Sequence, residues 1–179
     1  GAGVGRLGVV DHDTVSVTNL QRQIVHTTHS VGQLKTKSAE AFVTALNPHV
    51  DLVRIDTALT SDNAAAVLVD YDVVLDGTDN LVTRRLVAAE AAARRIPLVS
   101  GAVSMFSGQV TVIAPHLGGP DHGALFAEAA SDDNLPSCEA NGILGPVTGI
   151  IGTLMAMEAI KLITGMGRPL IGRLLIYDA

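Results

Sequence analysis

Side chains suited to phosphate chemistry gather in the first part of the chain. Asp11 closes an apolar run, and Thr18–Gln23 (TNLQRQ) follows with amides and one guanidinium. Arg22 offers a planar pair of N–H groups that matches phosphate oxygens, and Lys35 offers a compact positive charge. A carboxylate at the end of a strand can accept both hydroxyls of a ribose. This set predicts a nucleotide site.

A second polar group follows the apolar run Asp72–Leu75 (DVVL), at Asp76–Asn80 (DGTDN). Asp79 has the oxygen ligands that Mg²⁺ prefers, and Asn80 could hydrogen-bond a phosphate or cap a helix. Each of these residues, taken alone, also fits an ordinary turn or a solvated surface. A ribose acceptor, two cations and a metal carboxylate together indicate nucleotidyl transfer.

Periodicity predicts the elements that must position these groups. Strands are expected at residues 6–11, 50–55, 72–75, 98–102, 109–114 and 173–177, and helices at 31–46, 61–69, 80–95 and 146–164. Ser61 is expected to cap its helix. The alternation predicts an α/β fold, a Rossmann-like, mostly parallel sheet with helices on both faces. Asp11 and Asp79 then belong to one sheet edge, and Lys35 lies four residues into a helix.

The glycines of Gly1–Gly8 (GAGVGRLG) contain a formal G-x-G-x-x-G match. A working phosphate loop follows a strand and opens a helix, but here a strand follows at once at Arg6. We therefore expect a turn at this place and the true glycine loop upstream. On this interpretation residues 1–179 are one incomplete domain that lacks the first strand and helix of its fold.

Composition excludes several classes of protein. The 179 residues are 47% hydrophobic and 17% charged with a net charge of -6, which fits one packed domain and not a nucleic-acid binder. The longest apolar stretch, residues 143–157, is shorter than the ~20 residues of a membrane span, so a buried helix is expected. No export leader is visible, and a cytoplasmic location is expected.

Cysteine and histidine offer few metal ligands. Cys138 is the only cysteine, so neither an internal disulfide nor a four-cysteine zinc site is possible. The histidines follow no metal-ligand spacing, and most are expected at the surface: His26, His29, His49, His116 and His122.

Whole motifs resemble one family, the molybdopterin-synthase and thiazole-biosynthesis adenylyltransferases related to ubiquitin-activating enzymes. The matching segments are Asp11–Gln23 (DHDTVSVTNLQRQ), Val31–Lys35 (VGQLK), Leu75–Asn80 (LDGTDN), Pro97–Ala102 (PLVSGA), Gly108–Val112 (GQVTV), Gly145–Gly152 (GPVTGIIG) and Ala156–Lys161 (AMEAIK). They run in order over nearly the whole chain.

The resemblance implies ATP-dependent adenylation of the C-terminal Gly-Gly carboxylate of a ubiquitin-like sulfur carrier, of the molybdopterin or thiamine type. It assigns Asp11 to the ribose and Asp79 to Mg²⁺. The phosphates would be contacted by Asn19, Arg22 and Lys35, with Gln21 and Asn80 at the same site. It also implies a homodimer.

Two positions depart from the family pattern. The place of the first zinc-binding cysteine pair reads Asp121–Ala124 (DHGA), so no zinc is predicted. Cys138 lies where relatives place a cysteine that can form a thioester, and proximity to a helix start could lower its thiol pKa. Its alternative role is that of a small loop residue. The loop Pro115–Pro136 is expected to help select the carrier.

Two other functions stay open on sequence grounds. A nicotinamide-dependent oxidoreductase would use Gly1–Gly8 and Asp11, but it leaves the Thr18–Gln23 and Asp76–Asn80 clusters without a role. A degenerate regulatory subunit of an activating enzyme is the non-enzymatic alternative, although Arg22, Lys35 and Asp79 are all present.

Overall fold

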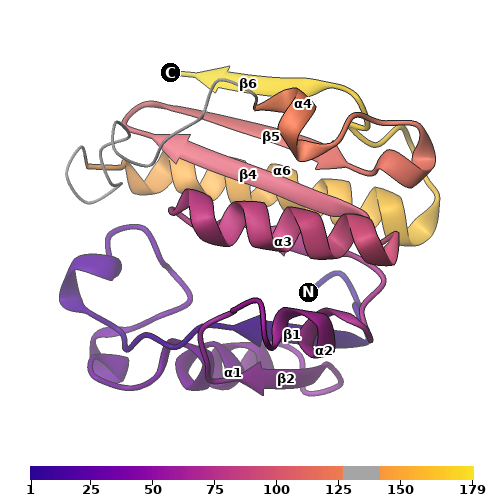
Figure 1. Cartoon of the computed structure of the whole chain (residues 1–179). Helices are drawn as coiled ribbons and strands as arrows, with labels where there is room; N and C mark the ends of the chain where they lie inside the picture. The colour runs from indigo at the N-terminus through magenta and orange to yellow at the C-terminus, as the bar shows by residue number, and fades with distance from the viewer. Residues whose placement is uncertain (127–141) are drawn as a thin grey trace. The chain divides into compact units, whose positions relative to one another are not determined.

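The computed structural model describes residues 1–126 and 142–179, which form two compact units (Figure 1). The first unit is Gly1–Leu59 and the second is Thr60–Ala179. Each has its own sheet, a parallel pair β1–β2 in the first and a four-stranded sheet in the order β3-β4-β5-β6 in the second.

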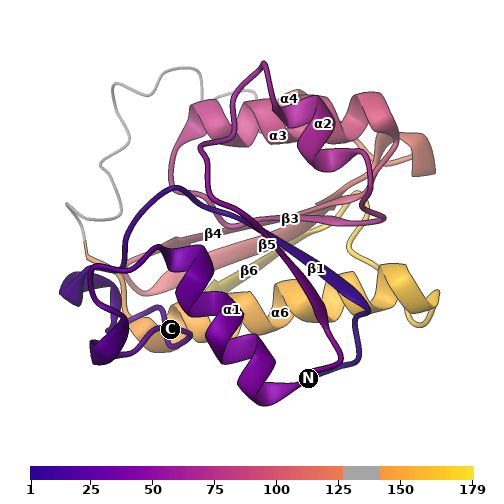
Figure 2. The same ribbon diagram turned by 90° about the horizontal axis from the view of Figure 1, so that it is seen from below.

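The first unit is one parallel crossover. Its elements are β1 (Arg6–Val10), the short 3₁₀ helices η1 (Val17–Asn19) and η2 (Thr28–Ser30), α1 (Lys35–Leu46) and β2 (Asp51–Ile55). Arg6 pairs with Asp51 and Val10 with Ile55, so the strands are in parallel register. α1 lies along this strand pair (Figure 2), which puts the 24-residue connection from β1 to α1 at one end of the strands.

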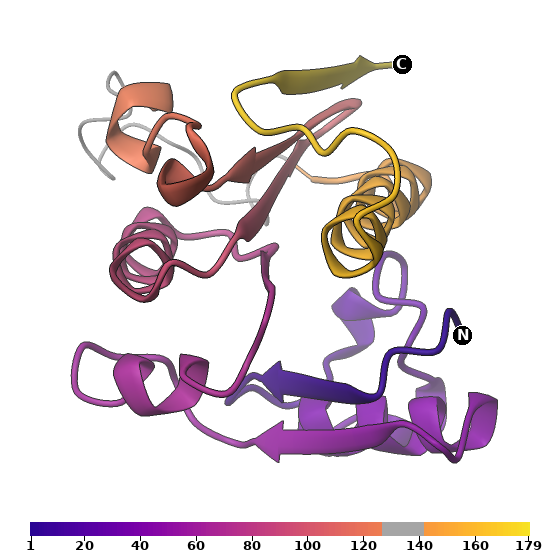
Figure 3. The same cartoon turned by 90° about the vertical axis from the view of Figure 1, so that its right-hand side faces the viewer.

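The second unit places helices on both faces of its sheet. Its elements are α2 (Ala64–Leu68), β3 (Val74–Asp76), α3 (Leu81–Arg94), β4 (Leu98–Ser104), β5 (Ser107–Ile113), η3 (Pro115–Leu117), α4 (His122–Leu125), α6 (Gly145–Thr164) and β6 (Leu174–Asp178). β3 and β4 are parallel, whereas β4–β5 and β5–β6 are antiparallel. α3 and α6 cover opposite faces of this sheet (Figure 3).

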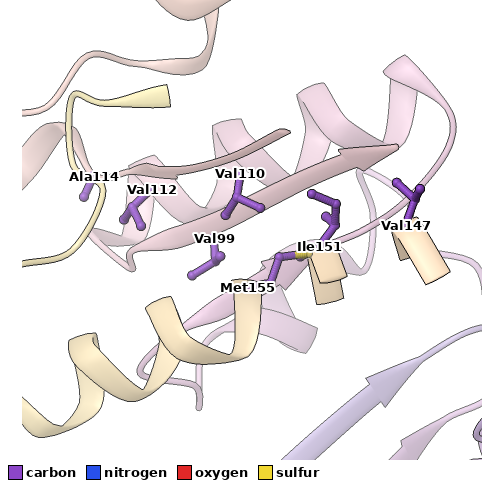
Figure 4. Packing of buried hydrophobic residues seen from close by; sticks show 7 residues of the cluster. All are labelled: Val99, Val110, Val112, Ala114, Val147, Ile151 and Met155. Carbon is purple, nitrogen blue, oxygen red and sulfur yellow. The ribbon is translucent and has the colours of Figure 1, made fainter. Parts of the chain in front are cut away.

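The core of the second unit lies between α6 and the sheet. Helix residues spaced by four, Val147, Ile151 and Met155, point at buried valines of β4 and β5 (Figure 4). Val99 and Val110 are completely buried there. Burial of this apolar surface is the main stabilising contribution of the helix.

Two glycines let α6 approach the sheet closely. A Cβ at Gly101 of β4 would lie 2.2 Å from Met155 Sδ, and one at Gly108 of β5 would lie 2.4 Å from Ile151 Cγ1. Real side chains do not tolerate such distances. These glycines therefore explain on packing grounds why the motifs at residues 97–102 and 108–112 contain them.

α6 has the length and apolar composition of a membrane-spanning helix, the only such case among the described residues. Its inner face packs on β4 and β5, as expected for a core helix. The helix is thus found with nearly the predicted bounds, but only 28% of its apolar window is buried, so the prediction of a buried helix holds for its inner face alone.

The α/β fold is confirmed, with several corrections of detail. α2 begins at Ala64 after Asn63, which makes no side-chain capping bond, so the predicted Ser61 cap is wrong. α1 begins at Lys35 and not at Val31, because residues 28–34 form a 3₁₀ turn and an extended approach. Gly1–Gly5 lead directly into β1 without a helix, as the turn interpretation requires.

Candidate functional site

The connection of residues 11–35, here called the polar loop, is held by short polar side chains. Ser16 caps η1, and Asn19 Oδ1 accepts a hydrogen bond from the Ser16 backbone N at 3.0 Å. Asn19 is buried, with 7% of its surface exposed. Its carbonyl oxygen therefore has a structural role, and only its amide nitrogen could serve a ligand.

Lys35 is the first residue of α1, whereas the sequence predicted a position four residues into the helix. Its backbone N donates to Asp13 O, and its Nζ lies 2.7 Å from Asp13 Oδ2 and 3.5 Å from Asp11 Oδ2. A cation at a helix N-terminus opposes the helix dipole, so the two carboxylates offset an unfavourable placement. The Lys35 hydrogen bond lowers the pKa of the Asp13 carboxyl below its ordinary value.

Asp11 follows β1 directly, as predicted. Its Oδ1 accepts the Asp13 backbone N at 2.8 Å, which fixes the carboxylate at the strand end. Ligand atoms of Asp11, His12 and Asp13 lie within 4.8 Å of one another, a spacing that could hold a metal ion. The Lys35 ammonium already supplies positive charge to both carboxylates, so this group does not fit a resident metal.

Arg22 is only lightly restrained. One terminal nitrogen donates to Thr18 O at 3.1 Å, and the other guanidinium donors have no hydrogen-bond partner among the described residues. Gln21 is exposed beside it. Both side chains are thus available to an anion, which is the role predicted for Arg22.

A pocket of about 340 Å³ opens in the first unit. Its lining combines apolar and polar residues: Val9, Val10, Asp11, Gln23, Ile24, Val25, His26, Lys35 and Ala39. His26 is buried, contrary to the predicted surface position, and its Nδ1 lies 2.9 Å from Ser38 Oγ. Burial, together with the Lys35 charge, lowers the pKa of His26.

In the second unit, residues 76–80 form a short connection, here called the acidic turn. Asp76 is buried, and its Oδ1 accepts from Thr78 N at 2.9 Å and from Thr78 Oγ1 at 2.7 Å. Asn80 caps α3 by accepting from Thr83 N at 2.8 Å, so the capping alternative is confirmed. Asp79 is exposed, and its carboxylate has no hydrogen-bond partner in residues 1–126 and 142–179.

The structure thus brings Asp11 and Lys35 together in the first unit, and Asp79 and Asn80 into one turn of the second. Asp13 was missed, although its position two residues after Asp11 in DHD was a usable signal. Cys138 lies outside the described residues.

At the place of the first zinc-binding pair, Asp121 caps α4 by accepting from Ala124 N at 2.7 Å. The described residues of this segment thus provide a helix cap where cysteine ligands would stand.

The whole chain, residues 1–179, matches the model of the ThiF family. It is 41% identical over 178 residues to "Molybdopterin-synthase adenylyltransferase" of Escherichia coli K12, covering 99% of this chain and 71% of that one. "Sulfur carrier protein adenylyltransferase" of Thermus thermophilus is 44% identical over 182 residues, with coverages of 99% and 67%.

"Adenylyltransferase and sulfurtransferase MOCS3" of Aedes aegypti is 43% identical over 178 residues. The match covers 99% of this chain but only 40% of that relative. Among solved structures, E. coli MccB superposes with a TM-score of 0.82 at 16% identity, covering 99% of this chain and 53% of that one, which supports the fold. The chain belongs to the ThiF family.

Proposed function

We propose that this chain is the nucleotide-binding part of an enzyme that adenylates the C-terminal carboxylate of a ubiquitin-like sulfur carrier. The observation that carries the proposal is Lys35 at the N-terminus of α1, held by Asp11 and Asp13, in the same polar loop that carries the lightly restrained Arg22. A helix N-terminus reinforced by two cations suits the phosphates of ATP. The names of the adenylyltransferase relatives agree with this chemistry.

The reaction needs charge neutralisation and positioning, and no protein nucleophile. A carboxylate oxygen of the carrier attacks the α-phosphorus of ATP, the new O–P bond forms, and the bond to the bridging oxygen breaks. Pyrophosphate leaves, the carrier becomes an acyl-adenylate, and no proton is transferred. Arg22 and Lys35 would stabilise the charge on the phosphate oxygens.

Asp79 fits a Mg²⁺ ion that accompanies ATP, because its exposed carboxylate is not engaged by any described residue. Asp11 would accept the ribose hydroxyls with its carboxylate, which the Asp13 backbone N holds at the strand end. Asn19, through its amide nitrogen, and Gln21 complete the set on the polar loop. Asn80 would contribute mainly through its helix cap.

The same proposal includes three further points. The carrier is of the molybdopterin or thiamine type, the protein is a homodimer, and Cys138 forms a thioester with the carrier. Cys138→Ala should leave adenylation intact and abolish sulfur transfer to the carrier. Unchanged sulfur transfer would remove Cys138 from the mechanism.

The proposal is tested by ATP–pyrophosphate exchange in the full-length protein with a panel of carriers ending in Gly-Gly. Carrier-dependent exchange that is lost in Asp79→Ala would support adenylation and name the partner. ATP binding without exchange for any carrier would favour a regulatory subunit. Tight NAD binding would contradict the proposal, and the absence of a helix after Gly1–Gly5 already speaks against that alternative.

A further inference from the structure

Arg84, one turn into α3, is not a surface cation. Its side chain is 13% exposed, and one terminal nitrogen donates to Thr78 O and, at 2.8 Å, to Gly101 O. The other terminal nitrogen lies 3.5 Å from Ser100 Oγ. The guanidinium thus fastens the acidic turn to β4.

The positive charge of the Arg84 guanidinium is paired with the Asp76 carboxylate. Asp76 Oδ2, on a side chain that is 2% exposed, lies 4.0 Å from Arg84 Nη1. Two buried charges stabilise each other only while both are present, and loss of one leaves the other uncompensated. Thr78 is consequently held from two sides, by the Asp76 carboxylate and by Arg84.

Thr78 immediately precedes Asp79. The Asp79 side chain itself has no hydrogen bond to another described residue, so the direction of its carboxylate depends on the backbone before it and on the Asn80 cap after it. We propose that Arg84 is a positioning residue that aims the Asp79 carboxylate at the Mg²⁺ of the nucleotide. This inference rests on the proposed function.

A lysine cannot replace this arginine. An ammonium is a point charge with a flexible stem, whereas three acceptors on two elements require a planar fork. Arg84→Lys should therefore keep the charge that balances Asp76 and lose the geometry that holds Thr78.

The test uses the full-length protein with a carrier that supports exchange, and compares Arg84→Lys, Arg84→Ala and Asp79→Asn. Arg95→Lys, at the exposed C-terminal end of α3, is the matched control. Three quantities are measured: the Mg²⁺ concentration for half-maximal exchange, Mn²⁺ binding by electron paramagnetic resonance with a non-hydrolysable ATP analogue, and amide hydrogen exchange of the peptide spanning residues 74–84.

Arg84→Lys is expected to raise the half-saturating Mg²⁺ concentration about tenfold, since a small misplacement of a ligand is costly. It should weaken Mn²⁺ binding by a similar factor and speed amide exchange at the acidic turn. Guanidinium ion should partly restore Arg84→Ala, and Arg95→Lys should behave as wild type.

A purely structural role predicts less folded protein with an unchanged Mg²⁺ requirement, and that result would overturn the inference. Unchanged Mn²⁺ binding in Asp79→Asn would overturn it as well, because there would be no ligand to position. If the wild type shows no exchange with any carrier, the proposed function fails, and Mn²⁺ binding with amide exchange still decides the role of Arg84.

Discussion

The polar loop and the acidic turn perform related tasks with opposite designs. Both follow a parallel strand and both lead into an α-helix. The polar loop spans residues 11–35 and is held by 3₁₀ turns and short polar side chains. Its Arg22 is lightly restrained, whereas its Lys35 side chain is only 14% exposed and is paired with two carboxylates. The acidic turn has five residues and is fastened to β4 by Arg84, whose side chain is 13% exposed.

Under the proposed function, the two segments differ in how firmly their functional side chains are held. Arg22, which would meet the phosphates, makes one hydrogen bond and can adjust. The backbone before Asp79, the proposed metal ligand, is tied to β4 by Arg84, and a metal ligand must keep a fixed direction. Substitutions in the polar loop should therefore change chemistry with little effect on folding, while those under the acidic turn should change folding and metal use together.

The strongest test of this contrast is Lys35→Ala. Removal of the cation at the start of α1 should lower carrier-dependent exchange about 100-fold or more, the scale of a lost electrostatic contact to a reacting group. Lys37→Ala, on the exposed side of the same helix, should leave exchange unchanged. Equal losses in both variants would mean that net charge, and not Lys35 itself, matters.

The next effect concerns the stability of the core between α6 and the sheet. Gly108→Ala should lower the free energy of unfolding by about 1–3 kcal/mol, the usual cost of overpacking a filled core. Gly101→Ala should cost less, because the flexible Met155 side chain can move aside whereas Ile151 is branched. Urea denaturation measures the free energy of unfolding of both variants. A larger loss in Gly101→Ala than in Gly108→Ala would show that Ile151 moves aside more easily than Met155.

Asn19→Asp separates the structural and ligand roles of one polar-loop residue. Aspartate keeps the oxygen that accepts from Ser16 N and replaces the amide nitrogen with a second oxygen. Thermal stability should fall, because a charged carboxylate is costly to bury, and the ATP Kd of the folded protein should rise about tenfold, as for a lost hydrogen bond to a charged group. An unchanged Kd, measured by calorimetry, would limit Asn19 to the η1 cap.

The smallest expected effect is the pH response of the polar loop. The pKa of His26 is lowered in the folded protein, so the unfolded chain binds more protons below its ordinary value, about 6.5. This contribution to stability is present above that pH and is lost as the pH falls toward the folded pKa. Chemical denaturation at pH 7.5 and 5.5 should show a smaller loss in His26→Gln than in wild type.

Sequence patterns predicted the elements well where an apolar repeat was long. The helix expected at residues 146–164 and the strands at 98–102 and 109–114 are found with small changes at their ends. The ends of α1 and α2 were less predictable, because 3₁₀ turns and local caps compete with helix in polar segments.

The site was predictable in part, since the types of Asp11, Arg22, Lys35 and Asp79 signal phosphate and metal chemistry wherever they lie. The role of Arg84 was not, because an arginine in the first turns of a helix usually projects into solvent. Only its contacts with Thr78 and Gly101 show otherwise. Those contacts depend on two elements separated in sequence, and no local pattern encodes them.

Gly101 also links the two faces of β4 mechanically. Met155 of α6 presses on the space where its side chain would be, while its carbonyl oxygen accepts from Arg84 on α3. A shift of Met155 that displaced the Gly101 peptide would also move its carbonyl oxygen, and with it the Arg84 guanidinium that holds the acidic turn. Under the proposed function, substitutions on the inner face of α6 should therefore change the Mg²⁺ requirement without contacting the nucleotide.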